Sequence, residues 1–197
     1  MCTERSPPIA SSKSRAAGGG EEAIISDPGY ACYANFISFP GGVPVPVPAA
    51  EADGFQLNPG AVASRITDKT KAIVINSPSN PTGTLLSARR MEAISDLGVR
   101  VISDEIYHGL VYAGRERSIL EFAEDAIVLN GFSKLYAMTG LRLGYLIAPP
   151  ELIRPIQKMQ QNLFSAPTAP SQTEEHAAVM KASHDTDFNG PPRLLWT

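Results

Sequence analysis

A lysine, an arginine and several small residues share one segment of the sequence. Lys134 follows the apolar run 126–133 (AIVLNGFS), which predicts a buried β-strand, and Arg142 comes eight residues later, after a Thr-Gly pair. In a partly desolvated site a lysine loses some of its preference for the charged form, so its neutral amine becomes available to attack a carbonyl carbon. The segment is therefore a candidate for Schiff-base chemistry.

Three more polar residues follow predicted strands. Tyr30 lies in SDPGY after the run AIIS, Asn80 lies in SPSNPTG after AIVIN, and Asp104 directly follows VRVIS. In an open parallel sheet, ligands bind beyond the carboxyl ends of the strands, where the connecting loops converge. We therefore expect these side chains to share one rim of the sheet with Lys134.

The residue types on this rim match the needs of one cofactor, pyridoxal 5′-phosphate (PLP). A carboxylate such as Asp104 can hold a proton on an aromatic ring nitrogen, and a tyrosine or asparagine can hydrogen-bond a phenolic oxygen. Arg142 can bind a phosphate through two hydrogen bonds, and Tyr30 offers a flat face to a ring. The set predicts a site for an aromatic aldehyde that carries a phosphate.

Alternating strands and helices predict the fold that positions these residues. Six runs rich in β-branched residues read as strands: 22–26, 43–47, 71–76, 99–103, 126–130 and 143–148. Helices are expected over 58–67, with Asn58 as N-cap and Pro59 at the first helical position, over 87–98, and over 151–164, where Pro155 lies in the first turn or kinks the helix. This alternation is typical of an α/β domain with three layers, a mostly parallel sheet with helices on both faces.

The ends of the chain and one strand have distinctive compositions. Residues 1–21 are rich in Ser, Ala, Gly and Pro and predict a disordered arm, residues 22–182 form the predicted domain, and residues 183–197 have no assignable structure. Pro44, Pro46 and Pro48 have no backbone N–H to donate, so the strand that contains them should be outermost in the sheet.

The overall composition favours a soluble globular protein. The 197 residues include 43% hydrophobic and 19% charged residues and have a formal net charge of −3. No basic block predicts nucleic acid as a partner, and no apolar run is long enough to cross a membrane. Two cysteines, without a disulfide framework or a metal-binding spacing, fit a reducing, cytoplasmic location, and no metal site is expected.

Four segments together carry a family resemblance. SDPGY, SPSNPTG, SDEIYHGL and GFSKLYAMTGLRLGY, in this order, resemble the large domain of fold-type I PLP enzymes, in particular the class I/II aminotransferases related to aspartate aminotransferase. The resemblance runs from about residue 22 to about residue 182. It implies transfer of an amino group between an amino acid and a 2-oxo acid, and cis peptide bonds before Pro28 and Pro81.

The resemblance implies a role for each site residue. Lys134 would form the internal aldimine and later move a proton between the substrate Cα and the cofactor, and Asp104 would pair with the pyridinium nitrogen. The remaining cofactor ligands would be Tyr107 and Asn80 at the phenolic oxygen, Tyr30 against the ring, and Arg142 with Ser133 at the phosphate. Many relatives place a phosphate-binding hydroxyl three residues before the lysine, where this chain has Gly131.

The family pattern also contains segments that this sequence lacks. Relatives have an N-terminal segment with a phosphate-binding helix and a C-terminal small domain with an arginine for the substrate carboxylate, and they are usually homodimers. We therefore expect an incomplete large domain with impaired activity. In the family the strand at 143–148 is antiparallel and lies between a missing strand and the strand at 126–130, so one of its edges should be unpaired.

Each residue taken singly also has a structural explanation. A loop lysine is usually solvated, Asp104 could cap a helix, NPTG could be only a turn, and Arg142 could be a surface ion-pair partner. Tyr30 and Tyr107 could be aromatic residues at the edge of the core, Cys32 is expected to be buried packing, and His108 is assigned no role because nothing places a partner beside it. The combined spacing favours the site.

Two alternative functions remain open from the sequence. The first is a PLP-dependent lyase, decarboxylase or synthase, because Lys134 and Asp104 would serve every route through a carbanion. The second is a non-catalytic remnant that binds at most the cofactor or assembles with another chain.

Overall fold

A seven-stranded mixed sheet forms the centre of the computed structural model, which describes residues 20–163 and the backbone of residues 194–196. The strands lie in the order β2-β1-β3-β4-β5-β6-β7. Their bounds are β1 Glu22–Asp27, β2 Val43–Pro48, β3 Thr70–Asn76, β4 Val101–Asp104, β5 Ile127–Gly131, β6 Gly144–Ile147 and β7 Leu194–Trp196. The six predicted strands are confirmed. The first five are parallel, and β6 is antiparallel to β5.

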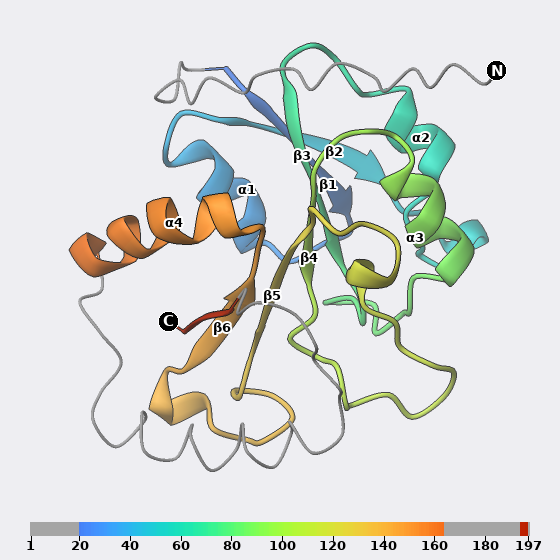
Figure 1. The fold of residues 1–197 in the computed structure, drawn as a ribbon. Helices are drawn as coiled ribbons and strands as arrows, with labels where there is room; N and C mark the ends of the chain where they lie inside the picture. Colours follow the sequence, from blue (N-terminus) through green and yellow to red (C-terminus); the bar gives the residue numbers. More distant parts are fainter. Residues whose placement is uncertain (1–19, 164–193, 197) are drawn as a thin grey trace, which may run out of the picture.

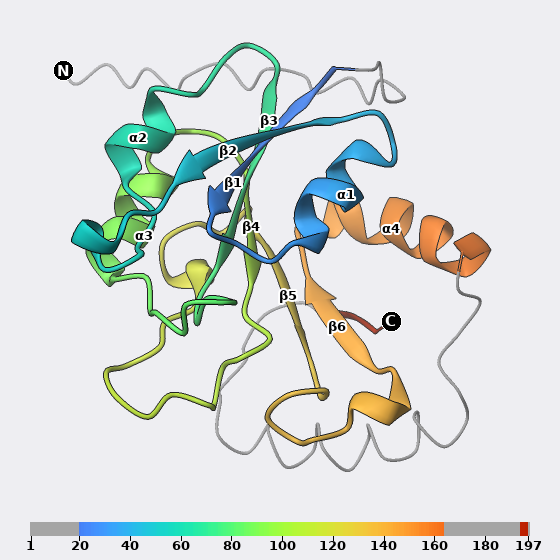
Figure 2. The same cartoon turned by 180° about the vertical axis from the view of Figure 1, so that it is seen from behind.

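Helices cover both faces of the sheet, as predicted (Figures 1 and 2). Helices α2 (Pro59–Ala63) and α3 (Ala88–Ser95) lie on one face, and α1 (Cys32–Ser38) and α4 (Pro150–Leu163) lie on the other. Single 3₁₀ turns occur at Glu51–Asp53, Ile119–Glu121 and Thr139–Leu141. Helix α1 was not predicted from the sequence.

The strands point alternate side chains into two hydrophobic layers. In β3, Ile73 and Ile75 pack with Met91 of α3, whereas Val74 packs on the opposite face with Tyr33 of α1. Consecutive side chains of a strand point to opposite faces, so a strand buried on both faces is apolar throughout. The unbroken apolar runs of the sequence therefore indicate the central position of these strands.

The predicted helix signals are mostly found in the structure. The Asn58 side chain accepts hydrogen bonds from the backbone N–H groups of Gly60 and Ala61, and Pro59 begins α2. Pro155 lies inside α4, where Ile156 packs toward the sheet but Met159 and Leu163 are 63% and 68% exposed. Leu152 and Ile153 of α4 also pack toward the sheet.

The sequence predicted an outermost β2 and an unpaired edge of β6, and only the first prediction is correct. The proline-rich strand β2 is outermost, as expected. The predicted unpaired edge of β6 is wrong, because β7 pairs with β6 in antiparallel register, with Leu146 opposite Leu195. An unpaired strand edge is a template for any extended segment, and residues 194–196 occupy it here. The predicted arm and the rest of the tail fall largely on residues 1–19, 183–193 and 197, which lie outside the described residues.

Gly131 lies where β5 and β6 approach closely. A Cβ atom at this position would lie 3.0 Å from the Gly144 Cα and 3.0 Å from the Leu143 carbonyl oxygen, both backbone atoms. The neighbouring backbone would have to shift by a few tenths of an ångström to accommodate a side chain here. Gly131→Ala is therefore expected to lower the free energy of unfolding by about 1–3 kcal/mol, as overpacking does in other cores.

Urea unfolding of this variant measures the effect directly. Gly140→Ala is the matched control, because a Cβ at Gly140 meets no atom within 4 Å. Equal unfolding midpoints for the two variants would contradict the steric account of Gly131.

Candidate functional site

The carboxyl ends of β3, β4 and β5 lie together at one end of the sheet, toward the bottom of Figure 1. Asn76 at the end of β3 is opposite Asp104 at the end of β4, and Asp104 is opposite Leu129 in β5. Lys134 follows β5 on the same side. The parallel register thus brings together segments that are up to 58 positions apart in the sequence, from Asn76 to Lys134.

A cavity of about 330 Å³ opens at this end. All seven residues that we predicted from the sequence line it: Tyr30, Asn80, Asp104, Tyr107, Ser133, Lys134 and Arg142. Asn76, Ile106, Leu129, Asn130 and Thr139 also line it. The structure therefore places Lys134 and Asp104 around the same space.

The Asp104 carboxylate is held from two directions. Tyr33 Oη donates to Asp104 Oδ2 over 2.6 Å, and the Ile106 N–H donates to Oδ1 over 3.1 Å. Tyr33 is 9% exposed, and its burial, together with the charge of Asp104, raises the pKa of the phenol well above its usual range. Tyr33 therefore remains a protonated donor to the carboxylate. It was not among the residues predicted from the sequence.

Two aromatic residues complete this side of the cavity. The Tyr30 ring lies edge-on to the Tyr33 ring, with centroids 5.3 Å apart and an interplanar angle of 79°. The pKa of Tyr30 is raised by a hydrogen bond with Cys32 and by the neighbouring charges. Cys32 is only partly buried and contacts a cavity residue, so its predicted role as buried packing is only partly correct.

Asn80 and Tyr107 meet across two loops. The Asn80 side-chain amide donates to Tyr107 Oη over 3.4 Å, and the Asn80 backbone N–H donates to Asn76 Oδ1 over 2.6 Å. The cis peptide bonds expected before Pro28 and Pro81 are present, and a third occurs before Pro78.

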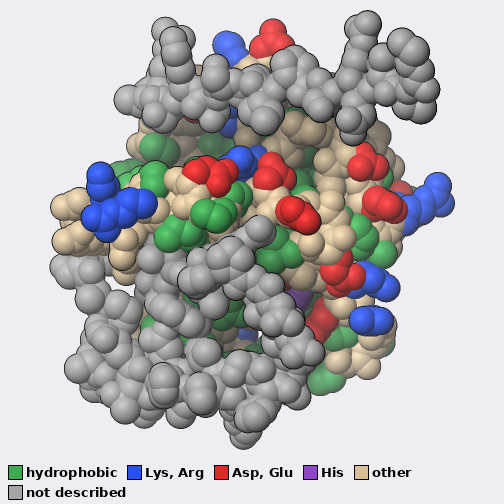
Figure 3. Space-filling view, viewed as in Figure 1, with side chains coloured by type: hydrophobic (Ala, Val, Ile, Leu, Met, Phe, Trp, Pro, Cys, Tyr) green, Lys and Arg blue, Asp and Glu red, His purple; other side chains and the backbone are tan. Residues whose placement is uncertain are grey.

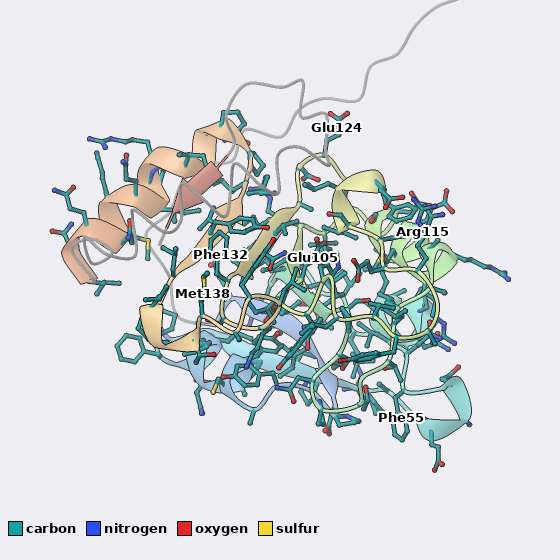
Figure 4. All side chains as sticks on the ribbon, turned by 90° about the horizontal axis from the view of Figure 1, so that it is seen from below. Phe55, Glu105, Arg115, Glu124, Phe132 and Met138 are labelled. Carbon is teal, nitrogen blue, oxygen red and sulfur yellow. The ribbon has the colours of Figure 1, made fainter. Side chains whose placement is uncertain are left out.

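The loop from β5 to β6 carries Lys134 and Arg142. Lys134 Nζ lies 5.6 Å from the centroid of the Tyr107 ring. The Thr139 hydroxyl donates to the Ser133 carbonyl over 2.8 Å, and the Arg142 guanidinium donates to the Thr139 carbonyl over 3.3 Å. Beneath this loop the buried Phe132 packs with Met138, and both are labelled in Figure 4.

Lys134 and Arg142 are both exposed. The sequence suggested Schiff-base chemistry for a lysine in a partly desolvated site, and the described part of the chain does not bury Lys134.

His108 has partners that sequence reasoning missed. Its Nδ1 lies 3.4 Å from Glu105 Oε2, and its Nε2 lies 3.0 Å from the Ser77 carbonyl oxygen. The Glu105 side chain is 4% exposed, and Figure 4 shows the residue in the interior, whereas Glu124 lies at the periphery. The signal in the sequence was the three-residue spacing from Glu105 to His108.

Glu105 makes the stability of the fold depend on pH. Burial raises the pKa of this carboxyl above the ordinary value of 4.5, although His108 and three hydrogen bonds oppose the shift. The folded chain therefore binds this proton more tightly than the unfolded chain. The resulting stabilisation is complete below pH 4.5 and is lost as the pH rises through the folded-state pKa.

We expect the free energy of unfolding to fall with rising pH in this window, by at most about 1.4 kcal/mol per pH unit. Glu105→Gln keeps an acceptor oxygen but cannot ionise, so this slope should disappear in urea unfolding measured over a pH series. Replacing the exposed Glu92 in the same way should leave the slope unchanged. Parallel curves for wild type and Glu105→Gln would contradict the assignment.

The described surface carries both basic and acidic side chains. On the face shown in Figure 3, basic and acidic side chains are intermixed, and no continuous basic surface forms among the described residues. Within residues 20–163, no helix is long and apolar enough to cross a membrane.

Comparison with known proteins identifies the class to which this fold and site belong. The family model "Aminotransferase class I and II" matches residues 11–190. An aspartate aminotransferase from Thermus thermophilus, solved with maleate, superimposes with a TM-score of 0.80 at 34% identity, over 86% of this chain and 46% of that one. The chain belongs to the class I and II aminotransferase family and has its fold-type I architecture.

Curated relatives have related activities. The chain is 44% identical over 172 residues to a (5-formylfuran-3-yl)methyl phosphate transaminase of Methanocaldococcus jannaschii, an alignment that covers 85% of this chain and 43% of that protein. It is 39% identical over 168 residues to an aspartate aminotransferase of Sulfurisphaera tokodaii, covering 81% and 42%. The chain thus spans less than half the length of these relatives.

Proposed function

We propose that this chain carries the PLP-binding core of an aminotransferase that transfers an amino group between an amino acid and a 2-oxo acid. The observation that supports this proposal is the cavity at the carboxyl ends of the strands. There an amine, a carboxylate, an amide–phenol pair, an aromatic ring and a guanidinium surround one space of about 330 Å³. Membership of the aminotransferase family supports the same conclusion.

The donors and acceptors of the cavity fit PLP. The Asp104 carboxylate has about four acceptor positions, and the two hydrogen bonds from Tyr33 and Ile106 leave room for a ring N–H. Lys134 and Arg142 outnumber Asp104 as charged groups in the lining, which suits an anionic ligand. Tyr107 Oη and the Asn80 amide supply further donors to the cavity.

When bound, PLP would supply an aldehyde that takes up an amino group and a ring that accepts the electron pair released from the substrate Cα. Asp104 would keep a proton on the ring nitrogen, held in place by Tyr33 and the Ile106 N–H. Asn80 and Tyr107 would donate to the phenolic oxygen, and Tyr30 would cover one ring face. Ser133 and Arg142 would bind the phosphate.

Lys134 would have two tasks in succession. Its Nζ would first bond the cofactor aldehyde and, after the substrate amine replaces it, would take a proton from the substrate Cα. The Tyr107 ring, 5.6 Å from Nζ, limits where the amine can lie. Because Lys134 is exposed, binding of cofactor and substrate would itself have to exclude water from the amine. A homodimer and a cytoplasmic location are further parts of this proposal.

Titration of the purified chain with PLP, followed by absorbance in the visible range, tests the function. We expect a saturable band, and pyridoxal, which lacks the phosphate, should bind more weakly because it makes no contact with Arg142. Addition of aspartate or an aromatic amino acid should then convert the band to that of the amine form of the cofactor. No band at any PLP concentration would overturn the proposal, and release of a 2-oxo acid without conversion would indicate a lyase instead.

A further inference from the structure

A buried polar cluster lies next to the cavity but does not line it. Glu105 is 3% exposed, and its Oε1 accepts hydrogen bonds from Ser103 Oγ at 3.0 Å, Ser118 Oγ at 3.2 Å and the Ile119 N–H at 2.9 Å. Its second oxygen, Oε2, faces His108. A buried carboxylate with this many partners is fixed in position. Glu105 therefore provides a rigid support for the imidazole.

The two ring nitrogens of His108 face two acceptors. Nε2 lies 3.0 Å from the Ser77 carbonyl oxygen, which can only accept, so Nε2 carries a proton and donates it. Nδ1 lies 3.4 Å from Glu105 Oε2, so the carboxyl group faces the other side of the ring. Glu105 thus sets the orientation of the ring and directs Nε2 at Ser77.

Ser77 is the anchor of the loop that contains Asn80. It is 1% exposed and is bonded at three atoms: its N–H donates to the Asp104 carbonyl at 3.2 Å, its Oγ accepts from the Leu86 N–H at 3.0 Å, and its carbonyl accepts from His108. The Leu86 bond closes the loop on itself. The His108 bond joins the Ser77 carbonyl to the turn that follows β4.

That turn also carries Tyr107. Because Tyr107 and His108 are adjacent, the bond from His108 to Ser77 holds the Tyr107 turn against the Asn80 loop. The bond from the Asn80 amide to Tyr107 Oη spans 3.4 Å, near the upper limit for a hydrogen bond, so a small displacement of either loop would break it. Asn80 and Tyr107 face the cavity, and the bond between them therefore depends on the bond from His108 to Ser77, which lies outside the cavity.

We propose that His108 is a positioning residue, which Glu105 orients and which places Asn80 beside Tyr107 by holding the Ser77 carbonyl. The importance of this placement for cofactor binding rests on the proposed function, whereas the placement itself can be tested without any cofactor. His108 does not line the cavity and is not a catalytic residue.

Three substitutions of His108 distinguish the contact of Nε2 with Ser77 from the contact of Nδ1 with Glu105. His108→Gln keeps an N–H donor near the position of Nε2, His108→Asn keeps one near Nδ1, and His108→Phe keeps the ring without either donor. Amide hydrogen exchange of the cofactor-free chain is the first measurement. We expect faster exchange over residues 79–84 in the Asn and Phe variants and wild-type exchange in the Gln variant. Unchanged exchange in the Asn and Phe variants would overturn the proposal.

A double-mutant cycle with Asn80→Ala tests the consequence for the cofactor. His108→Phe alone should raise the Kd for PLP by about 2- to 10-fold, the effect of one ordinary hydrogen bond. In the Asn80→Ala background the same substitution should have no further effect, because both changes remove the same contact. Additive effects would show that His108 acts elsewhere and would overturn the proposal. If the wild-type chain does not bind PLP, the proposed function fails, while hydrogen exchange still decides the role of His108.

Discussion

Replacement of Lys134 by alanine is expected to abolish the visible absorption band that PLP forms with the wild-type chain. The half-reaction with an amino acid should fall by more than about 10²-fold, because the group proposed to move the Cα proton is gone. Lys134→Arg should be equally inactive, since the guanidinium keeps the charge but offers no neutral amine. Absorbance spectra at saturating PLP and single-turnover kinetics measure both effects.

The control for Lys134 is another exposed lysine. Lys158 lies on α4 and does not line the cavity, so Lys158→Ala should leave the band and the half-reaction unchanged. Since Lys134 is exposed, its loss should also leave the unfolding midpoint unchanged. A band of normal intensity in Lys134→Ala would show that another amine binds the cofactor.

Replacement of Asp104 by alanine is expected to have the second-largest effect. Without the carboxylate, the proton on the cofactor ring loses its partner, and the half-reaction should slow by about 10²–10³-fold, as when other preorganised electrostatic contacts are removed. The buried Tyr33 hydroxyl also loses its acceptor, which costs about 1–3 kcal/mol of folding free energy.

Two further variants separate these effects of Asp104. Asp104→Asn keeps an acceptor for Tyr33 but removes the charge, so the rate should fall while most of the stability returns. Tyr33→Phe keeps the charge, so the rate should change less than in Asp104→Asn. Stopped-flow absorbance gives the rates and urea unfolding gives the stabilities. A rate in Asp104→Asn close to that of wild type would contradict the proposed role of the carboxylate.

The strands and the cavity lining could be predicted because both follow from a short-range pattern. Runs such as 72–75 are apolar at every position, which indicates a strand buried on both faces. Once those strands are parallel, residues at their carboxyl ends must meet, so Asp104, Asn80 and Lys134 could be placed together without any knowledge of contacts.

Sequence reasoning did not find elements that are very short or contacts between residues far apart in the chain. Helix α1 has only seven residues, and its buried face consists of Tyr33, Ala34 and Ile37, a pattern too short to indicate a helix by itself. The bond between Tyr33 and Asp104 spans 71 positions, so nothing local indicates it. Strand β7 has three residues, too few for a recognisable sequence pattern, and it forms by pairing with the edge of β6.

The exposure of Lys134 and the contact of His108 with Ser77 could not be predicted from the sequence, for the same physical reason. Residue type and position in the chain do not give the environment of a side chain, which depends on what packs over it. His108 is bonded to Ser77, 31 positions away, and this contact forms only when β3 and β4 pair. Lys134 remains outside the core because its loop projects beyond β5.

The most direct test of the central claim is to reduce the PLP-treated chain with borohydride and to locate the attached pyridoxyl group by peptide mass spectrometry. We predict stoichiometric labelling at Lys134, blocked by Lys134→Ala and weakened by Asp104→Ala. Labelling spread over exposed lysines such as Lys71 and Lys158, or an absence of label at Lys134, would contradict the assignment of this cavity as the cofactor site.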